Sequence, residues 1–266
     1  MKRPKKVGEE RARHAVPRQL ARPLSVDYAS SMRAKDEIRK SIWETLQQNR
    51  VARFPGAEGR IPNFVGAEAC AKRLAETPYW KAARVLKINP DSPQRAIRQR
   101  ALADGKVIYM AVPRLRSEKP FTELDPKKLK CSPYAAASIK GASQYGRPVT
   151  LAQVRRIDLV VCGSVAVNRD GARVGKGGGY SDLEFALLTQ EKKIGRRTPI
   201  VTSVHPLQIV DEAIPMTVHD IPLSAVVTPT EVIEVAAQWP RPKGIYWKML
   251  PSEKIDEIPV LKQSLE

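Results

Sequence analysis

The sequence predicts an α/β protein with a mostly parallel sheet that is covered by helices on both faces. Short apolar runs alternate with segments of helical spacing, and the runs are almost continuously apolar. Parallel strands show this pattern because crossover helices bury both of their faces. The length of 266 residues fits one such domain with tails. The predicted strands are 84–88, 107–112, 157–162, 199–204 and 225–227.

Two helices are expected before the first of these strands. Ile38, Ile42 and Leu46 recur at four-residue spacing, which predicts a helix over 34–50. A shorter helix is expected at 66–75.

Further helices are expected between the strands. Residues 93–103 begin with Pro93 in the first turn and are followed by Gly105, a pairing typical of helix ends. A helix is also expected at 180–193. Residues 114–150, rich in Lys, Pro, Ser and Ala, are expected to be irregular.

Composition predicts three parts along the chain. Residues 1–30 are polar, basic and interrupted by prolines, which is typical of a flexible arm. Residues 31–237 form the α/β domain, and residues 238–266, with several prolines and aromatic residues, form a C-terminal extension packed on the surface.

The charge of the chain favours anionic partners. The net charge is +18 and the isoelectric point is about 10.0. Such a field attracts nucleic acid, anionic membranes or phosphorylated small molecules. No apolar stretch approaches the roughly 20 residues of a membrane span, so we expect a cytoplasmic protein without a membrane partner. The three cysteines, Cys70, Cys131 and Cys162, lack the spacing of a metal site and are expected to be reduced thiols. For the oligomeric state, both a monomer and a homodimer stay open.

The segment 173–182 carries the strongest chemical signal. It holds glycines at 175, 177, 178 and 179, directly before a predicted helix. Glycine contributes little to a core, but it lets backbone N–H groups turn toward one point at a helix N-terminus, where anions bind. Arg173 and Lys176 add positive charge. We interpret the segment as a phosphate-binding loop of neither the Walker A nor the dinucleotide type, with a flexible surface loop as the alternative.

Carboxylates near this loop are candidate Mg²⁺ ligands. Asp182 follows the glycines, and oxygen ligands shared with phosphates suit Mg²⁺. The alternative for Asp182 and for Glu184 is an acid in the first helical turn that is stabilised by the helix dipole. Asp220, in a loop between predicted strands, is a second candidate, and His219 beside it is interpreted as a structural hydrogen-bonding residue.

Several segments in the same order resemble the 5-formyltetrahydrofolate cyclo-ligase family. The loop 173–182 looks like the family pattern R-[LV]-G-x-G-x-G-Y-x-D, and order and spacing agree from about residue 34 to 230. The other matching segments are Lys35-x-x-Ile38-Arg39, Gly105-Lys106 before a strand ending at Pro113, and Ile214-Pro215 with His219-Asp220 and Val227-Thr228.

This resemblance implies a three-layer α/β/α fold of the NagB/RpiA/CoA transferase-like class and a reaction that uses ATP and Mg²⁺. In the family, ATP phosphorylates the formyl oxygen of 5-formyltetrahydrofolate, a reduced folate. The second ring nitrogen then attacks, phosphate leaves, and 5,10-methenyltetrahydrofolate forms.

Carried over by position, the resemblance also implies residue roles. Asp182 and Asp220 would hold Mg²⁺, and Arg173 and Lys176 would act in catalysis. The ATP-binding residues would be Lys35, Arg39, Arg173, Gly175, Lys176, Gly177, Gly178, Gly179, Tyr180 and Ser181.

The sequence departs from the family pattern at several places. Ser181 stands where the family commonly has a second tyrosine, and Cys162 stands where it often has proline. A folate-binding glutamate is expected near residues 87–94, where Asp91 is the nearest acid and therefore the candidate substrate-binding residue. The segments 87–91, 113–116 and 179–184 look closer to a divergent branch, the methenyltetrahydrofolate synthetase domain-containing proteins. Two alternatives follow: a nucleotide-binding homologue without catalysis, and a basic nucleic-acid-binding protein.

Overall fold

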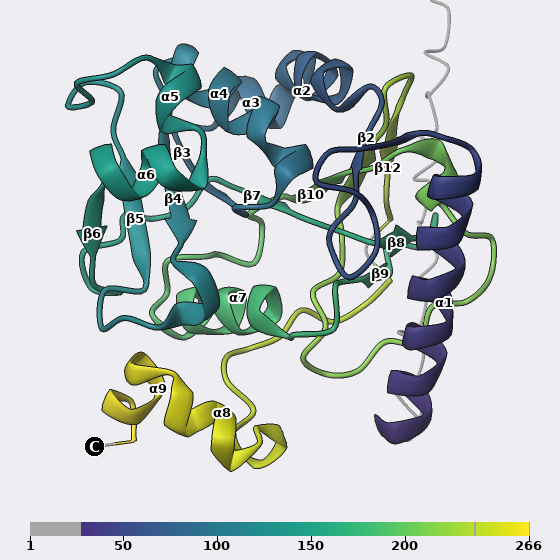
Figure 1. Ribbon diagram of the computed structural model, residues 1–266. Coiled ribbons are helices and arrows are strands. Elements are labelled where there is room, and N and C mark those ends of the chain that lie inside the picture. Colours follow the sequence, from purple (N-terminus) through teal and green to yellow (C-terminus); the bar gives the residue numbers. More distant parts are fainter. Residues whose placement is uncertain (1–27, 237, 266) are drawn as a thin grey trace, which may run out of the picture.

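The computed structural model describes residues 28–236 and 238–265, and within these ranges an eight-stranded sheet forms the centre of the protein (Figure 1). The strand order is β12-β11-β10-β7-β3-β4-β5-β6. The middle strands pair in parallel: β11 (Ala225–Val227), β10 (Ile200–Ser203), β7 (Leu159–Cys162), β3 (Val85–Ile88) and β4 (Val107–Ala111). The edge strands pair antiparallel: β12 (Val232–Glu234), β5 (Phe121–Leu124) and β6 (Arg147–Val149).

Helices cover both faces of this sheet, as Figure 1 shows, so the fold is the predicted three-layer α/β/α arrangement with a mostly parallel sheet. One face carries α2 (Ala67–Glu76), α3 (Pro78–Ala82), α4 (Arg95–Ala103), α5 (Pro133–Ala136) and α6 (Ile139–Tyr145). The other face carries α7 (Tyr180–Gln190), followed outward by α8 (Ser252–Glu257) and α9 (Pro259–Gln263).

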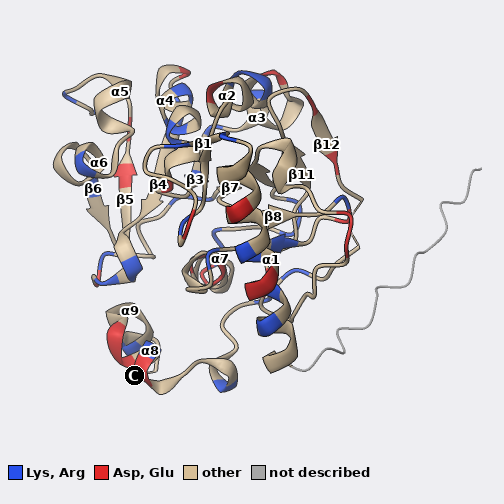
Figure 2. Ribbon diagram, turned by 45° about the vertical axis from the view of Figure 1, so that its right-hand side comes forward, with Lys and Arg blue, Asp and Glu red and all other residues tan. Residues whose placement is uncertain are grey.

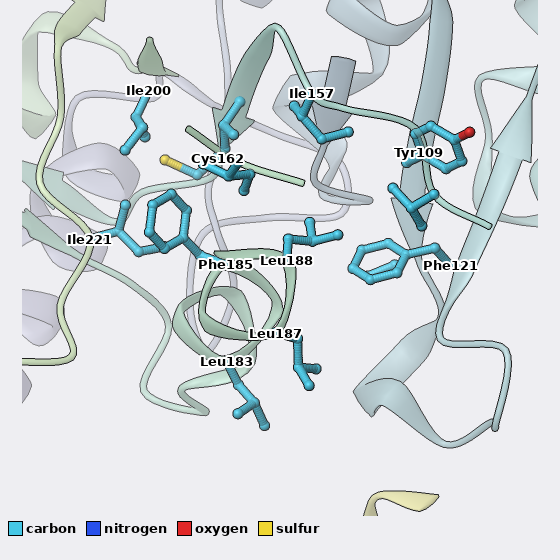
Figure 3. Close-up of a cluster of buried hydrophobic side chains, with 14 of the residues drawn as sticks. Tyr109, Phe121, Ile157, Cys162, Leu183, Phe185, Leu187, Leu188, Ile200 and Ile221 are labelled. Atoms are coloured by element: carbon cyan, nitrogen blue, oxygen red, sulfur yellow. The ribbon is translucent and has the colours of Figure 1, made fainter. Parts of the chain in front are cut away.

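The core has one apolar cluster on each face of the sheet. On the α7 side, Phe185 and Leu188 pack with residues of the sheet and its loops such as Phe121, Ile157 and Ile200 (Figure 3). The cluster also includes Leu261 from α9, so the C-terminal segment belongs to this core. Burial of this kind is the main force that holds the layers together.

Helix α1 (Tyr28–Gln48) lies beside the sheet rather than on one of its faces (Figure 1). Its apolar positions Ile38, Ile42 and Leu46 form a third cluster with the small hairpin of β8 (Ala166–Val167) and β9 (Arg173–Val174). A second small hairpin joins β1 (Ala52–Arg53) and β2 (Asn63–Phe64). Because β9 leads directly into the glycine segment, this packing sets where that segment lies.

The predicted strands are confirmed, each within two residues of its predicted bounds. The expectation for 114–150 is wrong, because this stretch contains β5, α5, α6 and β6. Its strands are short, and β6 holds Pro148, which an edge strand tolerates because one side of its backbone makes no ladder bonds.

The helix bounds need smaller corrections. Helix α1 begins at Tyr28 rather than at residue 34, and α7 ends at Gln190 rather than at residue 193. The predicted helix over 93–103 divides into the 3-10 turn η1 (Ser92–Gln94) and α4. Residues 1–27 of the predicted arm lie outside the described residues. No helix in the described ranges is both long and apolar enough to cross a bilayer.

Candidate functional site

Loops at the carboxyl ends of the central strands surround one cavity of about 600 Å³. Residues 89–92 follow β3, residues 112–114 follow β4, and Gly163 follows β7. This edge is where parallel α/β sheets place their ligands. The rest of the cavity lining includes the segment 175–182 and one side of α1, so segments distant in sequence meet here.

The glycine loop, residues 175–179, connects β9 to α7 and depends on backbone angles that favour glycine. Gly177 has φ 103° and Gly179 has φ 67°, both in the left-handed region that side chains disfavour. Gly179 caps α7 in this conformation without a side-chain cap. The first-turn N–H groups of α7 therefore have no intrahelical partner and carry the positive end of the helix dipole.

Helix α1 holds the glycine loop through Arg39. Its Nε donates to the Gly175 carbonyl over 2.7 Å, and its guanidinium forms an ion pair with Asp36 over 2.5 Å. Although Arg39 is buried, it lines the cavity together with Gly177.

Helix α1 also holds the loop that contains Asp220. The Lys35 ammonium lies 2.6 Å from Asp220 Oδ2, and both side chains are buried. The same oxygen accepts hydrogen bonds from the backbone N–H and hydroxyl of Thr217, over 2.6 and 2.8 Å. Burial would raise the pKa of Asp220, but the charge of Lys35 and the bonds from Thr217 outweigh it and lower that pKa. The carboxylate is therefore ionised in the folded protein at neutral pH.

Arg173 joins the end of β7 to the first turn of α7. Its guanidinium donates to the Gly163 carbonyl over 2.9 Å and to Asp182 Oδ1 over 2.7 Å. Burial works against the charge of Arg173, but Asp182 above all, and Asp220 in addition, raise the pKa of the guanidinium. Both candidate metal ligands therefore lie in the field of one buried cation.

Asp182 and Asp220 each keep one carboxylate oxygen available. Asp182 Oδ2 and Asp220 Oδ1 take no hydrogen bond from any described residue, because their partners contact the other oxygen. Across 28–236 and 238–265, no three His, Cys, Asp or Glu side chains gather as a metal site. The two aspartates could thus hold only a cation that takes most of its ligands from elsewhere, as Mg²⁺ does with phosphates and water.

A buried polar network under the loop was not predicted from the sequence. Lys87 of β3 lies 2.5 Å from Glu184 of α7 and also contacts Asn89, whose amide donates to the Ser181 hydroxyl over 3.1 Å. Burial raises the pKa of Glu184 despite the nearby Lys87. A lysine inside an otherwise apolar strand is the signal that points to such a network.

The loop after β3 is fixed by Arg98 of α4. This buried side chain donates to the carbonyls of Asn89, Asp91 and Ala137 over 2.5, 3.0 and 2.8 Å, and burial lowers its pKa to about 10. Asp91 therefore lines the cavity, and its Oδ2 lies 2.8 Å from the place of a Cβ on Gly163.

The cavity wall is positive on balance. It has seven Lys or Arg side chains against four Asp or Glu. Lys35, Arg39 and Arg173 are each paired with a carboxylate. Figure 2 shows that α1 carries both basic and acidic residues. Within the described ranges, the lining cations that have no carboxylate within 4.0 Å are Arg60, Arg114, Lys176 and Lys254.

All residues that the sequence predicted for the site line this one cavity. Their roles in binding and catalysis remain proposals. Lys254 of α8 lies among them although no motif pointed to it, and His219 contacts the Thr217 hydroxyl as a structural residue would.

Comparison with known sequences gives one family. The model of the 5-formyltetrahydrofolate cyclo-ligase family matches residues 31–229. The methenyltetrahydrofolate synthase domain-containing protein of Bos taurus is 37% identical over 234 residues, which cover 86% of this chain and 61% of that protein. Its counterpart in Mus musculus is 38% identical over 88% of this chain and 63% of its own length. The chain thus spans about three fifths of these relatives.

A shorter match and one solved structure carry ligase names. The mitochondrial 5-formyltetrahydrofolate cyclo-ligase of Arabidopsis thaliana is 37% identical over 83 residues, 30% of each chain. The NMR structure of 5,10-methenyltetrahydrofolate synthetase from Aquifex aeolicus is 19% identical, covers 76% of this chain and 92% of its own, and has a TM-score of 0.49.

Proposed function

The chain belongs to the 5-formyltetrahydrofolate cyclo-ligase family, and from this premise we propose that it is an ATP- and Mg²⁺-dependent 5-formyltetrahydrofolate cyclo-ligase. The observation that carries the proposal is the meeting of the glycine loop, the cations of α1 and two aspartates at one cavity. The product would be 5,10-methenyltetrahydrofolate, together with ADP and phosphate.

The residues present fit a nucleoside triphosphate. The N–H groups at the start of α7 and the Lys176 ammonium provide donors and positive charge, and among the described residues no carboxylate competes for Lys176. Arg39 holds the loop carbonyl at Gly175, so the loop is shaped before a ligand arrives. A pre-formed site loses less conformational entropy on binding.

The chemistry divides between the ligands and the chain. ATP supplies the phosphoryl group that turns the formyl oxygen into a leaving group, and Mg²⁺ supplies charge neutralisation. Asp182 and Asp220 would hold the metal through Oδ2 and Oδ1. Arg173 and Lys176 would stabilise negative charge on the phosphates, as cations do in other phosphoryl transfers. The folate would lie beside the loop after β3, with Asp91 as its hydrogen-bonding acid.

A second candidate is a homologue that binds the nucleotide without turning over the folate. Both candidate metal ligands are already engaged by cations of the chain, Asp182 by Arg173 and Asp220 by Lys35. Because these cations already neutralise the two carboxylates, the site binds Mg²⁺ more weakly than a site with two unpaired carboxylates would.

Calorimetric titration of the full chain with Mg·ATP tests the shared part of both candidates. Lys176→Ala should weaken binding about tenfold, because a charged hydrogen bond to phosphate is lost, while Lys40→Ala, on the exposed side of α1, should leave it unchanged. If Lys176→Ala bound Mg·ATP as tightly as the wild type, the assignment of the glycine loop as the phosphate-binding segment would be rejected.

Turnover then separates the two candidates. The full chain with Mg·ATP and 5-formyltetrahydrofolate should generate the absorbance of the methenyl product and should need all three components. ATP binding without product formation, at an enzyme concentration equal to that of the folate, would favour the second candidate.

A further inference from the structure

We infer that the C-terminal segment completes this site and that Lys254 of α8 is a phosphate-binding residue. The inference rests on the proposed function, because it assigns Lys254 to the same bound triphosphate. It adds a residue from beyond the family match, which ends at residue 229.

Lys254 contacts the glycine loop directly. Its Nζ donates to the Gly178 carbonyl over 2.5 Å and lies 4.7 Å from the centre of the Tyr180 ring. A Cβ on Gly179 would lie 3.4 Å from the same nitrogen. The ammonium therefore lies against the loop at the point where the loop becomes α7.

The ammonium keeps capacity for an anion. It has three N–H donors, and Gly178 takes one of them. Within 28–236 and 238–265 no carboxylate lies within 4.0 Å of Nζ, although the side chain is partly buried and lines the cavity. Burial lowers the pKa of Lys254, and the more distant Glu257 and Asp182 oppose this only in part. A phosphate oxygen would supply the missing counter-charge.

The segment is anchored, so Lys254 does not lie on a free tail. Ile258, Val260 and Leu261 are buried in the cluster that also contains Leu183 and Leu187 of α7. Figure 1 shows α8 and α9 next to α7, on the side away from the sheet. Because α7 and Lys254 share this cluster, the position of the ammonium relative to the loop is set by the core.

The test compares Lys254→Gln with Lys248→Gln in the full chain. Glutamine keeps an N–H donor near Gly178 but removes the charge, and Lys248 is an exposed lysine of the same segment that does not line the cavity. Each protein is titrated with Mg·ATP and with AMP, and thermal unfolding confirms that it is folded. We expect Lys254→Gln to weaken Mg·ATP binding about tenfold and AMP binding much less, because the charge acts on the outer phosphates.

Four outcomes would overturn the inference, and each is distinct. Equal Mg·ATP affinity of Lys254→Gln and the wild type would reject Lys254 while leaving the proposed function intact. An equal loss for AMP and Mg·ATP would show that Lys254 only positions the loop. A wild-type chain that binds no Mg·ATP would reject the proposed function and this inference with it. A tenfold loss in Lys248→Gln as well would assign the effect to general charge rather than to the site.

Discussion

At the scale of single residues, the site is built from buried charges whose partners come from distant segments. Lys35 pairs with Asp220, Arg173 with Asp182, and Lys87 with a glutamate of α7. A buried pair adds modest net stability, but removal of one partner is costly because the other charge stays desolvated. These pairs therefore fix the positions of the segments around the cavity more than they stabilise the fold as a whole.

The pair of Lys35 and Asp220 predicts a specific pH dependence. The folded-state pKa of Asp220 lies below the usual 3.8, so its ionised form stabilises the fold at higher pH. Asp220→Asn should lower the free energy of unfolding by about 3 kcal/mol near neutral pH. This difference should persist down to the ordinary aspartate pKa and should shrink as pH falls further, through the lowered folded-state pKa. Urea unfolding of both proteins from pH 7 to pH 3 measures it.

The double variant Lys35→Met with Asp220→Asn provides the control. It removes both charges, so it should be less destabilised than the two single variants added together. The difference between the sum of the single variants and the double variant is the coupling energy of the pair. This coupling energy should fall toward zero as the pH falls below the ordinary aspartate pKa. A difference between wild type and Asp220→Asn that grows toward acid pH would contradict the sign of the pKa change.

The site residues that belong to ordered motifs were predictable from the sequence, whereas those outside such motifs were not. Asp182 and Asp220 follow recognisable segments, so their meeting at one cavity was predictable. Lys87 sits in an apolar strand and its partner Glu184 lies far along the chain, so only the fold reveals the pair. Lys254 has no motif around it, and its place depends on how the last helices pack.

At the scale of elements, the glycine that begins α2 shows how one backbone angle positions a helix. Gly66 has φ 96°, and a Cβ there would lie 2.7 Å from Cγ of Pro229, which follows β11. The absence of a side chain lets the start of α2 approach the end of the strand closely. The helix and the edge of the sheet therefore share a contact that only glycine permits.

Gly66→Ala should consequently destabilise the protein more than Gly59→Ala. Both positions have positive φ, but nothing lies within 4 Å of a Cβ at Gly59. The φ of Gly66 also lies further from the left-handed minimum than the φ of Gly59. The excess for Gly66→Ala, about 1–3 kcal/mol, therefore reports the clash with the proline ring together with this added backbone strain. Denaturant unfolding of the two variants gives the comparison. Equal losses would show that α2 can shift away from Pro229 without cost.

The C-terminal helices contribute to the core more than their composition suggested. Leu261 of α9 is fully buried, whereas Leu265 beyond it is 59% exposed. Leu261→Ala should lower the free energy of unfolding by about 2–5 kcal/mol through lost burial and a cavity. Leu265→Ala should change it by less than about 0.5 kcal/mol. Chemical denaturation of both variants measures this, and a small loss for Leu261→Ala would mean that the segment docks without supporting the domain.

The strands with almost continuous apolar runs were predictable from the sequence, whereas the strands interrupted by polar residues or proline were not. The apolar runs of the central strands are broken only by Lys87 in β3 and leave no polar face, so their burial was evident. Strand β5 has two adjacent polar residues between two apolar ones, and β6 has three residues with a proline. Such edge strands form because a neighbouring strand offers unpaired backbone groups, which is tertiary information.

At the scale of the whole molecule, the chain carries a net charge of +18. Such a charge also attracts nucleic acid, but the positive groups that line the cavity suit a compact anion such as a triphosphate. The excess of positive charge also destabilises the folded state, because the surface cations repel one another. Ion pairs at the surface offset little of this, since each contributes less than about 1 kcal/mol.

Added salt should therefore stabilise the protein against heat. Between about 20 and 200 mM NaCl the screening length falls from over 20 Å to under 10 Å, which removes most long-range repulsion. The buried pairs, such as Lys35 with Asp220, are screened far less and should persist. A gain of about 1 kcal/mol would raise the melting temperature by about 2–4 °C for a chain of this size. Calorimetry in NaCl and in KCl of equal ionic strength should give the same rise, because screening depends on ionic strength alone. A melting temperature that falls with salt would show that attractive surface pairs outweigh the repulsion of the net charge.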